Sequence, residues 1–404
     1  MNPSDKLEIE QIVQELQALP LFHFSLSSKE LFHSNFLAWI CQLYPNILGK
    51  VFADSLNNNQ ATCEIDHVCR EHQNSDLKIK YTHGETLVIE NKVKSLPYLH
   101  QLREYSLKNP DANFILLSLI EPTSVEFDYN QESQQIIIPD KPFIWHYLSY
   151  GDLAQKLETI LLEIFRENNY HGQLLDEYIQ FIKYLHALQS FFQINDPENT
   201  LFCNGNIDKL REIRFHDVMT KSWYSQLTKL LKQRLKAEKF DINRNWEEIK
   251  KGEITVNSDM INGKGYCEFY YCIKNRTSCL NNGQEIGGTI ILGIQIDYYD
   301  VKVSWGYWHD KIKGRSIAEK LFNEKIWFDL SLIPGDAQEY PIRKDKIFNQ
   351  FDQGSFLYRS KRLENTITVN ELIDLMMKYL YIIQEREREI EAVIEEVLIS
   401  ESGR

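Results

Sequence analysis

The order of secondary-structure signals in the first third of the chain constrains the fold more than any other feature. Three segments with the composition of strands follow one another closely, at Thr62–Glu71, Leu77–Tyr81 and Thr86–Val93. A helix signal over Pro97–Lys108 separates them from the continuous apolar run Phe114–Ile120, which is typical of a buried strand. This succession predicts an α/β fold with a mixed sheet flanked by helices.

Further helices and one further strand complete this predicted first domain. Apolar residues at helical spacing predict a core helix over Leu31–Ile40, with Ser27 or Ser28 as its N-cap. A strand predicted at Gln135–Pro139 is expected at an edge of the sheet. The remaining helices are predicted at Ile47–Leu56, Asp152–Phe165 and Leu174–Phe192.

A second domain is expected because 404 residues exceed what one hydrophobic core usually supports. Helix-breaking residues place the border near residues 195–206, which divides the chain into residues 1–200 and 201–404. Alternation of apolar and polar residues predicts an antiparallel sheet from the segments Glu253–Val256, Gly265–Lys274, Thr289–Asp297 and Val301–Trp308. A capping box at Thr368–Glu371 opens one long helix, so the second domain is predicted to be α+β.

The charge of the chain is unevenly distributed. The net charge is −13, which is unusual for a protein that binds phosphates through Lys and Arg. Between Lys209 and Lys239, however, there are nine basic and three acidic residues. One face of this predicted helix carries Lys229, Lys232, Lys236 and Lys239, with Trp223 and Tyr224 upstream. The segment is interpreted either as a phosphate-tracking, base-stacking surface or as the solvated face of an ordinary amphipathic helix.

The cysteines indicate a reducing compartment, because the chain has seven of them and no CxxC pair. Cys63, His67, Cys69 and His72 form a possible zinc cluster, although half-buried positions on a strand explain the same pattern. No apolar run approaches the length of a bilayer span, and the first residues are polar and acidic. The expectation is a cytoplasmic protein with no membrane association.

The third predicted strand carries an acid and a base on one face. In Val88–Val93, strand alternation directs Glu90 and Lys92 to one side and the intervening residues to the other. A carboxylate can bind a divalent cation through oxygen, and an ammonium nearby can polarise a water molecule. Asp76, on the preceding strand of the same hairpin, is within reach of that cation. These groups together suit hydrolysis of a phosphodiester.

The helix that follows contributes two further polar residues. Gln101 and Tyr105 are four positions apart, so their side chains lie on one helical face. Both are able to hydrogen-bond phosphate or water. The pair gains significance from its position directly after the strand of Glu90 and Lys92.

Asp76, Glu90-x-Lys92 and Gln101-x-x-x-Tyr105, in this order, resemble the RecB-type, QxxxY-bearing branch of the PD-(D/E)XK nucleases. More closely, the chain is similar to a bacterial PD-(D/E)XK nuclease family of uncharacterised function. The stretches that carry the likeness are Glu30–Ser34, Phe36–Trp39, Arg70–Glu71, Asp76–Leu77, Ile89–Lys92 and Gln101–Tyr105. The resemblance covers about residues 25–190, and Ser75 stands where the family name has proline.

This resemblance implies a restriction-endonuclease-like core that hydrolyses DNA with Mg²⁺ or Mn²⁺. Asp76 and Glu90 would be metal ligands and Lys92 the catalytic lysine, while Gln101 and Tyr105 would shape the substrate side of the site. A role in DNA repair, restriction or phage defence is the biological context that the resemblance implies, and RNA stays open as a substrate.

The resemblance also implies that Glu30 or His33, on the first core helix, contacts metal or phosphate. The two are three positions apart and both stay open as candidates. Two other functions are considered besides the nuclease. One is a nucleic-acid-binding or regulatory protein whose catalysis has lapsed, and the other is a scaffold that pairs with a second copy or a partner protein through the C-terminal domain and its last helix.

Overall fold

The chain folds into two compact units. The N-terminal unit comprises Asn2–Gln193 and Gly205–Gln226, and the C-terminal unit comprises Ile194–Asn204 and Leu227–Arg404. Residues 205–226, expected in the second domain, thus group with the first. The computed structural model describes residues 3–26, 30–56, 63–72, 75–122, 128–138, 143–202, 208–243, 248–261, 264–274, 289–297, 300–308, 311–335, 348–351, 356–364 and 366–402.

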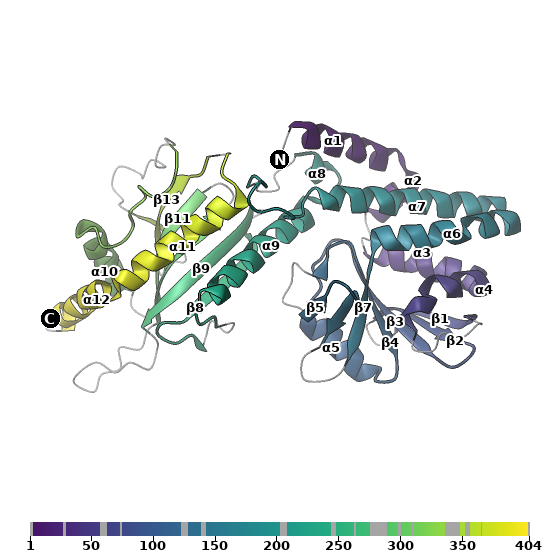
Figure 1. Cartoon of the computed structure of the whole chain (residues 1–404), viewed down its shortest axis with the longest axis horizontal. Coiled ribbons are helices and arrows are strands. Elements are labelled where there is room, and N and C mark those ends of the chain that lie inside the picture. Colours follow the sequence, from purple (N-terminus) through teal and green to yellow (C-terminus); the bar gives the residue numbers. More distant parts are fainter. Residues whose placement is uncertain are drawn as a thin grey trace. The chain divides into compact units, whose positions relative to one another are not determined.

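A seven-stranded mixed sheet forms the centre of the N-terminal unit, with the strand order β1-β2-β3-β4-β7-β6-β5 (Figure 1). The strands β1 to β3 form an antiparallel meander, whereas β4 runs parallel to both β3 and β7. This confirms the prediction of a mixed α/β sheet. The strand bounds are β1 Ile65–His72, β2 Ser75–Tyr81, β3 Thr86–Lys92, β4 Asn113–Ser118, β5 Asp128–Asn130, β6 Gln135–Ile137 and β7 Ile144–Ser149.

Helices lie on both sides of this sheet (Figure 1). On one face, Leu102 and Tyr105 of α5 (Leu99–Lys108) pack in a buried cluster with Val88, Phe114 and Trp145. The helices α3, α6 and α7 lie on the other side. The remaining helical bounds in this unit are α1 Pro3–Ala18, α2 Pro20–Ser25, α3 Glu30–Leu43, α4 Pro45–Leu48, α6 Tyr150–Glu167, α7 Asn169–Ser190, α8 Asp208–Glu212 and the first part of α9 (His216–Ala237).

Two predicted elements of this unit differ in the structure. The strand predicted at Gln135–Pro139 is not an edge: β6 lies between β5 and the unpredicted strand β7, which pairs with β4. The helix predicted at Ile47–Leu56 is instead α4 followed by a 3₁₀ helix, η1 (Gly49–Ser55). A Cβ on Gly49 would lie 1.6 Å from the Cys63 carbonyl oxygen, so only glycine permits this close approach. The cap candidates Ser27 and Ser28 lie outside the described residues.

A six-stranded antiparallel sheet forms the C-terminal unit, in the order β12-β13-β11-β10-β9-β8. Every pair of neighbouring strands is antiparallel, as the sequence predicted. The bounds are β8 Ile254–Ile261, β9 Lys264–Lys274, β10 Thr289–Asp297, β11 Asp300–Trp308, β12 Asn349–Phe351 and β13 Phe356–Arg362, with helices α10 Lys311–Asn323, α11 Val369–Glu385 and α12 Glu387–Ser402.

The end of the chain forms two helices where the sequence predicted one. The capping box is present, because the Thr368 hydroxyl accepts from the Glu371 N–H and the Glu371 carboxylate accepts from the Thr368 N–H. The break falls at Arg386, whose guanidinium donates to the carbonyl oxygens of Lys325 and Ile326. The apolar stripe of α12 is buried, and its members are Ile390, Val393, Ile394, Val397 and Leu398.

Within the described ranges, none of the helices combines the length and the apolar character that crossing a bilayer requires.

Candidate active site

The hairpin of β2 and β3 places two carboxylates opposite each other. Leu77 pairs with Ile89 in this antiparallel ladder. Asp76, just before Leu77, and Glu90, just after Ile89, are therefore cross-strand neighbours on one face. The Asp76 carboxylate also accepts a hydrogen bond from the backbone N–H of Asn91, at 2.8 Å. This bond holds Asp76 beside the strand that carries Glu90.

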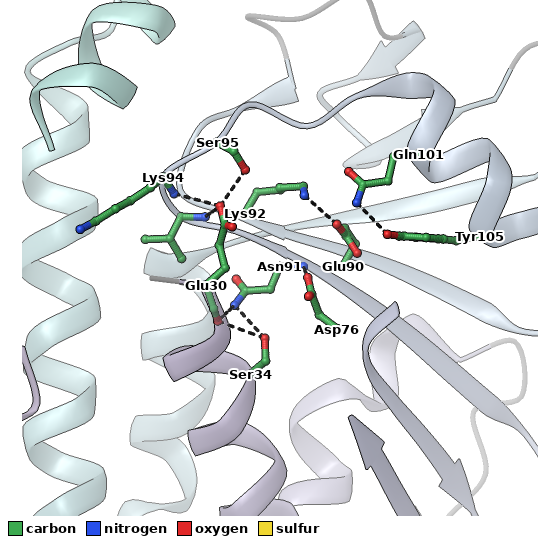
Figure 2. A network of polar contacts seen from close by, with 11 residues as sticks. Glu30, Ser34, Asp76, Glu90, Asn91, Lys92, Lys94, Ser95, Gln101 and Tyr105 are labelled. Atoms are coloured by element: carbon green, nitrogen blue, oxygen red, sulfur yellow. Dashed lines mark hydrogen bonds and ion pairs between the residues drawn. The ribbon is translucent and has the colours of Figure 1, made fainter. Parts of the chain in front are cut away.

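Lys92 lies on the same face and forms an ion pair with Glu90. The distance from Lys92 Nζ to Glu90 Oε1 is 2.8 Å, and both side chains are nearly buried, with exposed fractions of 10% and 1% (Figure 2). The second carboxylate oxygen of Glu90, Oε2, is buried without a hydrogen-bond partner. A buried carboxylate oxygen without a hydrogen-bond partner is energetically unfavourable, and a cation or a proton bound to it would stabilise it.

Burial disfavours the charged forms of the two carboxylates. Burial raises the pKa of Glu90 to about 8, and the neighbouring Asp76 adds to this shift while Lys92 opposes it. Burial likewise raises the pKa of Asp76, against the opposing effects of the Asn91 N–H and Lys92. A proton or a divalent cation would therefore stabilise this pair of buried carboxyl groups.

The helix α5 brings Gln101 and Tyr105 to the same face of the sheet. The Gln101 side-chain amide donates to the Tyr105 hydroxyl at 2.7 Å, which leaves the hydroxyl proton for another acceptor. Burial is the main cause of the raised pKa of Tyr105, and the charge of Glu90 contributes to it. Figure 2 shows this pair beside the ion pair of Glu90 and Lys92.

The two candidates on α3 lie in different environments. Glu30 Oε1 accepts hydrogen bonds from the N–H groups of Val93 and Lys94 and from the Ser95 hydroxyl. His33 is 1% exposed, and its Nδ1 lies 3.2 Å from the Tyr178 hydroxyl among aromatic rings. Glu30 therefore lies against the segment that follows Lys92. His33, in contrast, lies in the aromatic core.

Asn91 is a site residue that the sequence analysis did not identify. Its side-chain amide donates to the Glu30 carbonyl oxygen at 3.0 Å and to the Ser34 hydroxyl at 3.1 Å. It accepts from the Tyr150 hydroxyl at 2.5 Å. The sequence signal was an amide between Ile89 and Val93, on a strand face that is otherwise apolar.

The oxygen donors of the candidate site suit Mg²⁺ bound in part by water and substrate. Among the described residues, no three His, Cys, Asp or Glu side chains converge as a metal-binding group. Mg²⁺, however, commonly uses one or two carboxylates and completes its shell with water and substrate oxygens. Asp76 and Glu90, with the unpartnered Oε2, fit that mode.

The other candidate sites receive less support. The described members of the possible zinc cluster likewise do not converge into a metal-binding group. In the basic segment, Trp223 and Tyr224 are buried at 3% and 0% exposure, so they are core residues rather than a platform for bases. Lys236 is exposed, while Lys229 and Lys232 are partly buried.

Comparison with known proteins identifies no relative of this chain. No family model matches it, and neither does any curated protein or solved structure.

Proposed function

We propose that this chain is a metal-dependent nuclease that hydrolyses DNA phosphodiester bonds on a restriction-endonuclease-like N-terminal core. The observation that carries the proposal is the convergence of Asp76, Glu90 and Lys92 on one face of β2 and β3. Two carboxylates and an ammonium in a nearly buried position are the groups that this chemistry needs.

The order of elements supports the proposed fold. The chain runs through α3, then, after α4 and η1, through β1 to β3, α5 and β4, which is the order of helix, strands, helix and strand that the sequence predicts. The strand β3 then carries Glu90 and Lys92, and α5, the next helix, carries Gln101 and Tyr105. The position of these four residues on adjacent elements supports the proposal of one shared site.

The residues would act in distinct ways. Asp76 and Glu90 would hold Mg²⁺ or Mn²⁺, which when bound supplies positive charge and lowers the pKa of a coordinated water. Lys92 would orient the attacking water with its ammonium and offset the negative charge that develops at the scissile phosphate. Tyr105, whose hydroxyl accepts from Gln101, would donate its own proton in a hydrogen bond to a phosphate oxygen.

The test is a cleavage assay with purified protein on plasmid, single-stranded DNA and single-stranded RNA, with Mg²⁺ or Mn²⁺. We expect Glu90→Ala and Lys92→Ala to reduce cleavage by at least about a hundredfold, because each removes a group from the reaction centre. Lys302→Ala is the matched control, since it breaks a comparable strand ion pair, Lys302 with Asp297, in the other sheet.

Cleavage that survives in both site variants would contradict the site assignment. Binding of DNA without cleavage by the unaltered chain would instead favour a protein whose catalysis has lapsed. Cleavage of RNA alone would support the proposed hydrolysis but identify RNA, and not DNA, as the substrate.

A further inference from the structure

Glu30, the first residue of α3, contacts the chain on both sides of Lys92. Its side-chain Oε1 accepts from Val93 N at 3.3 Å, Lys94 N at 3.2 Å and Ser95 Oγ at 2.7 Å. Its backbone carbonyl oxygen accepts from the Asn91 side-chain amide at 3.0 Å. Figure 2 shows these contacts converging on Glu30.

The acceptor capacity of Glu30 Oε1 is committed to these contacts. An oxygen of a carboxylate offers two lone pairs, and three donors already share this one. Hydrogen bonds to an ionised carboxylate are also stronger than those to a neutral acceptor. Oε1 is therefore occupied with ordering the backbone of residues 93–95 and is a poor candidate for a metal ligand, so a metal bond to Glu30 would have to use Oε2 alone.

The ordered segment connects the two halves of the candidate site. Residues 93–98 lead from β3, which carries Glu90 and Lys92, into α5, which carries Gln101 and Tyr105. The direction in which the chain leaves β3 therefore affects where α5 lies on the sheet. A contact that fixes residues 93–95 constrains both Lys92 and the face of α5 above it.

We propose that Glu30 is a positioning residue that clamps the chain on both sides of Lys92, and that it is not a ligand of the metal ion. This inference rests on the proposed nuclease function for its effect on the reaction. The clamp itself rests only on the hydrogen bonds of Glu30. A glutamine keeps an acceptor oxygen at the same place, so it preserves much of the clamp while removing the charge that a metal ligand would need.

The experiment compares Glu30→Gln and Glu30→Ala with the unaltered chain. Hydrogen exchange of the peptide that spans residues 93–98 reports the clamp, calorimetric titration with Mn²⁺ reports metal binding, and the plasmid assay reports kcat and KM. Glu177→Ala is the matched control, because the Glu177 carboxylate also accepts from a backbone N–H, that of Leu21, at 2.8 Å.

We expect Glu30→Ala to accelerate amide exchange at residues 93–95 by at least tenfold and to lower kcat by at least tenfold. The Kd for Mn²⁺ and the KM should stay within threefold of the unaltered values. Glu30→Gln should stay within threefold in all of these measurements. Glu177→Ala should leave the exchange of residues 93–95 and the cleavage rate unchanged.

Three results would overturn the inference. Unchanged exchange in Glu30→Ala would show that no clamp exists. Faster exchange with undiminished kcat would show a structural contact without a positioning role. Mn²⁺ binding at least tenfold weaker in Glu30→Gln would identify a metal ligand. If the unaltered chain neither binds Mn²⁺ nor cleaves nucleic acid, the proposed function fails, and the exchange rates still decide whether the clamp exists.

Discussion

At the scale of single residues, Tyr105 provides a direct test of the substrate side of the site. Its hydroxyl accepts from Gln101 and lies beside Glu90 and Lys92. We expect Tyr105→Phe to lower the cleavage rate about tenfold, equivalent to about 1.4 kcal/mol, because one donor to the phosphate is lost. Tyr147→Phe is the control, since it removes another buried hydroxyl of the same unit, at 3.3 Å from the Ser118 carbonyl oxygen. Equal rates for Tyr105→Phe and the unaltered chain would exclude a catalytic role for this hydroxyl.

The second residue-scale prediction concerns His33 and pH. Burial, with a smaller contribution from the charge of Lys94, lowers the pKa of His33 from 6.5 to about 3. As the pH falls, the unfolded chain therefore takes up a proton at His33 before the folded chain does. The stability due to neutral His33 is complete above pH 6.5 and is lost between pH 6.5 and pH 3. We expect the loss between pH 7 and pH 5 to be about 2 kcal/mol. Urea unfolding at both pH values measures it, and His33→Phe should reduce the difference by a similar amount. An identical pH dependence in the variant would refute the assignment.

At the scale of elements, η1 depends on a close backbone approach. The Cβ of an alanine at position 49 would lie 1.6 Å from the Cys63 carbonyl oxygen, just before β1. Because backbone atoms must move to relieve this contact, we expect Gly49→Ala to lower the free energy of unfolding by about 3 kcal/mol. Lys50→Ala, at the exposed neighbouring residue, should change it by no more than about 0.5 kcal/mol. Thermal unfolding followed by circular dichroism distinguishes the two, and a Gly49→Ala variant as stable as Lys50→Ala would contradict this account.

At the scale of the whole molecule, the apolar stripe of α12 contributes to the interior of the chain's own C-terminal unit. Ile394 is 2% exposed and Ile390 is fully buried. We expect Ile394→Asp to lower stability by more than about 3 kcal/mol, because an unpaired charge would enter an apolar interior. Differential scanning calorimetry measures the loss, and light scattering after gel filtration reports the oligomeric state. A variant that keeps its melting temperature but changes its oligomeric state would show that the stripe serves pairing between chains.

Local patterns were sufficient for much of the fold and for the shared strand face of Glu90 and Lys92. Alternation along β3 correctly assigned Glu90 and Lys92 to one face, and the capping box at Thr368–Glu371 was located by its spacing. The errors occur where a distant contact decides the outcome. Arg386 divides the last helix by bonding to carbonyl groups of residues 325 and 326, and β7 forms beside β4, about thirty residues earlier in the chain.

The sequence by itself determined which chemical groups this chain has and which of them share a strand or a helical face, because side-chain direction follows from backbone periodicity. It predicted Asp76, Glu90, Lys92, Gln101 and Tyr105 as site residues, and it left Glu30 and His33 as equal candidates. Only the tertiary structure separated these two: Glu30 accepts from residues 93–95, whereas His33 lies among aromatic rings. The physical reason is that burial and hydrogen bonding depend on partners far away in the sequence, in this case about sixty residues from Glu30 and more than a hundred from His33.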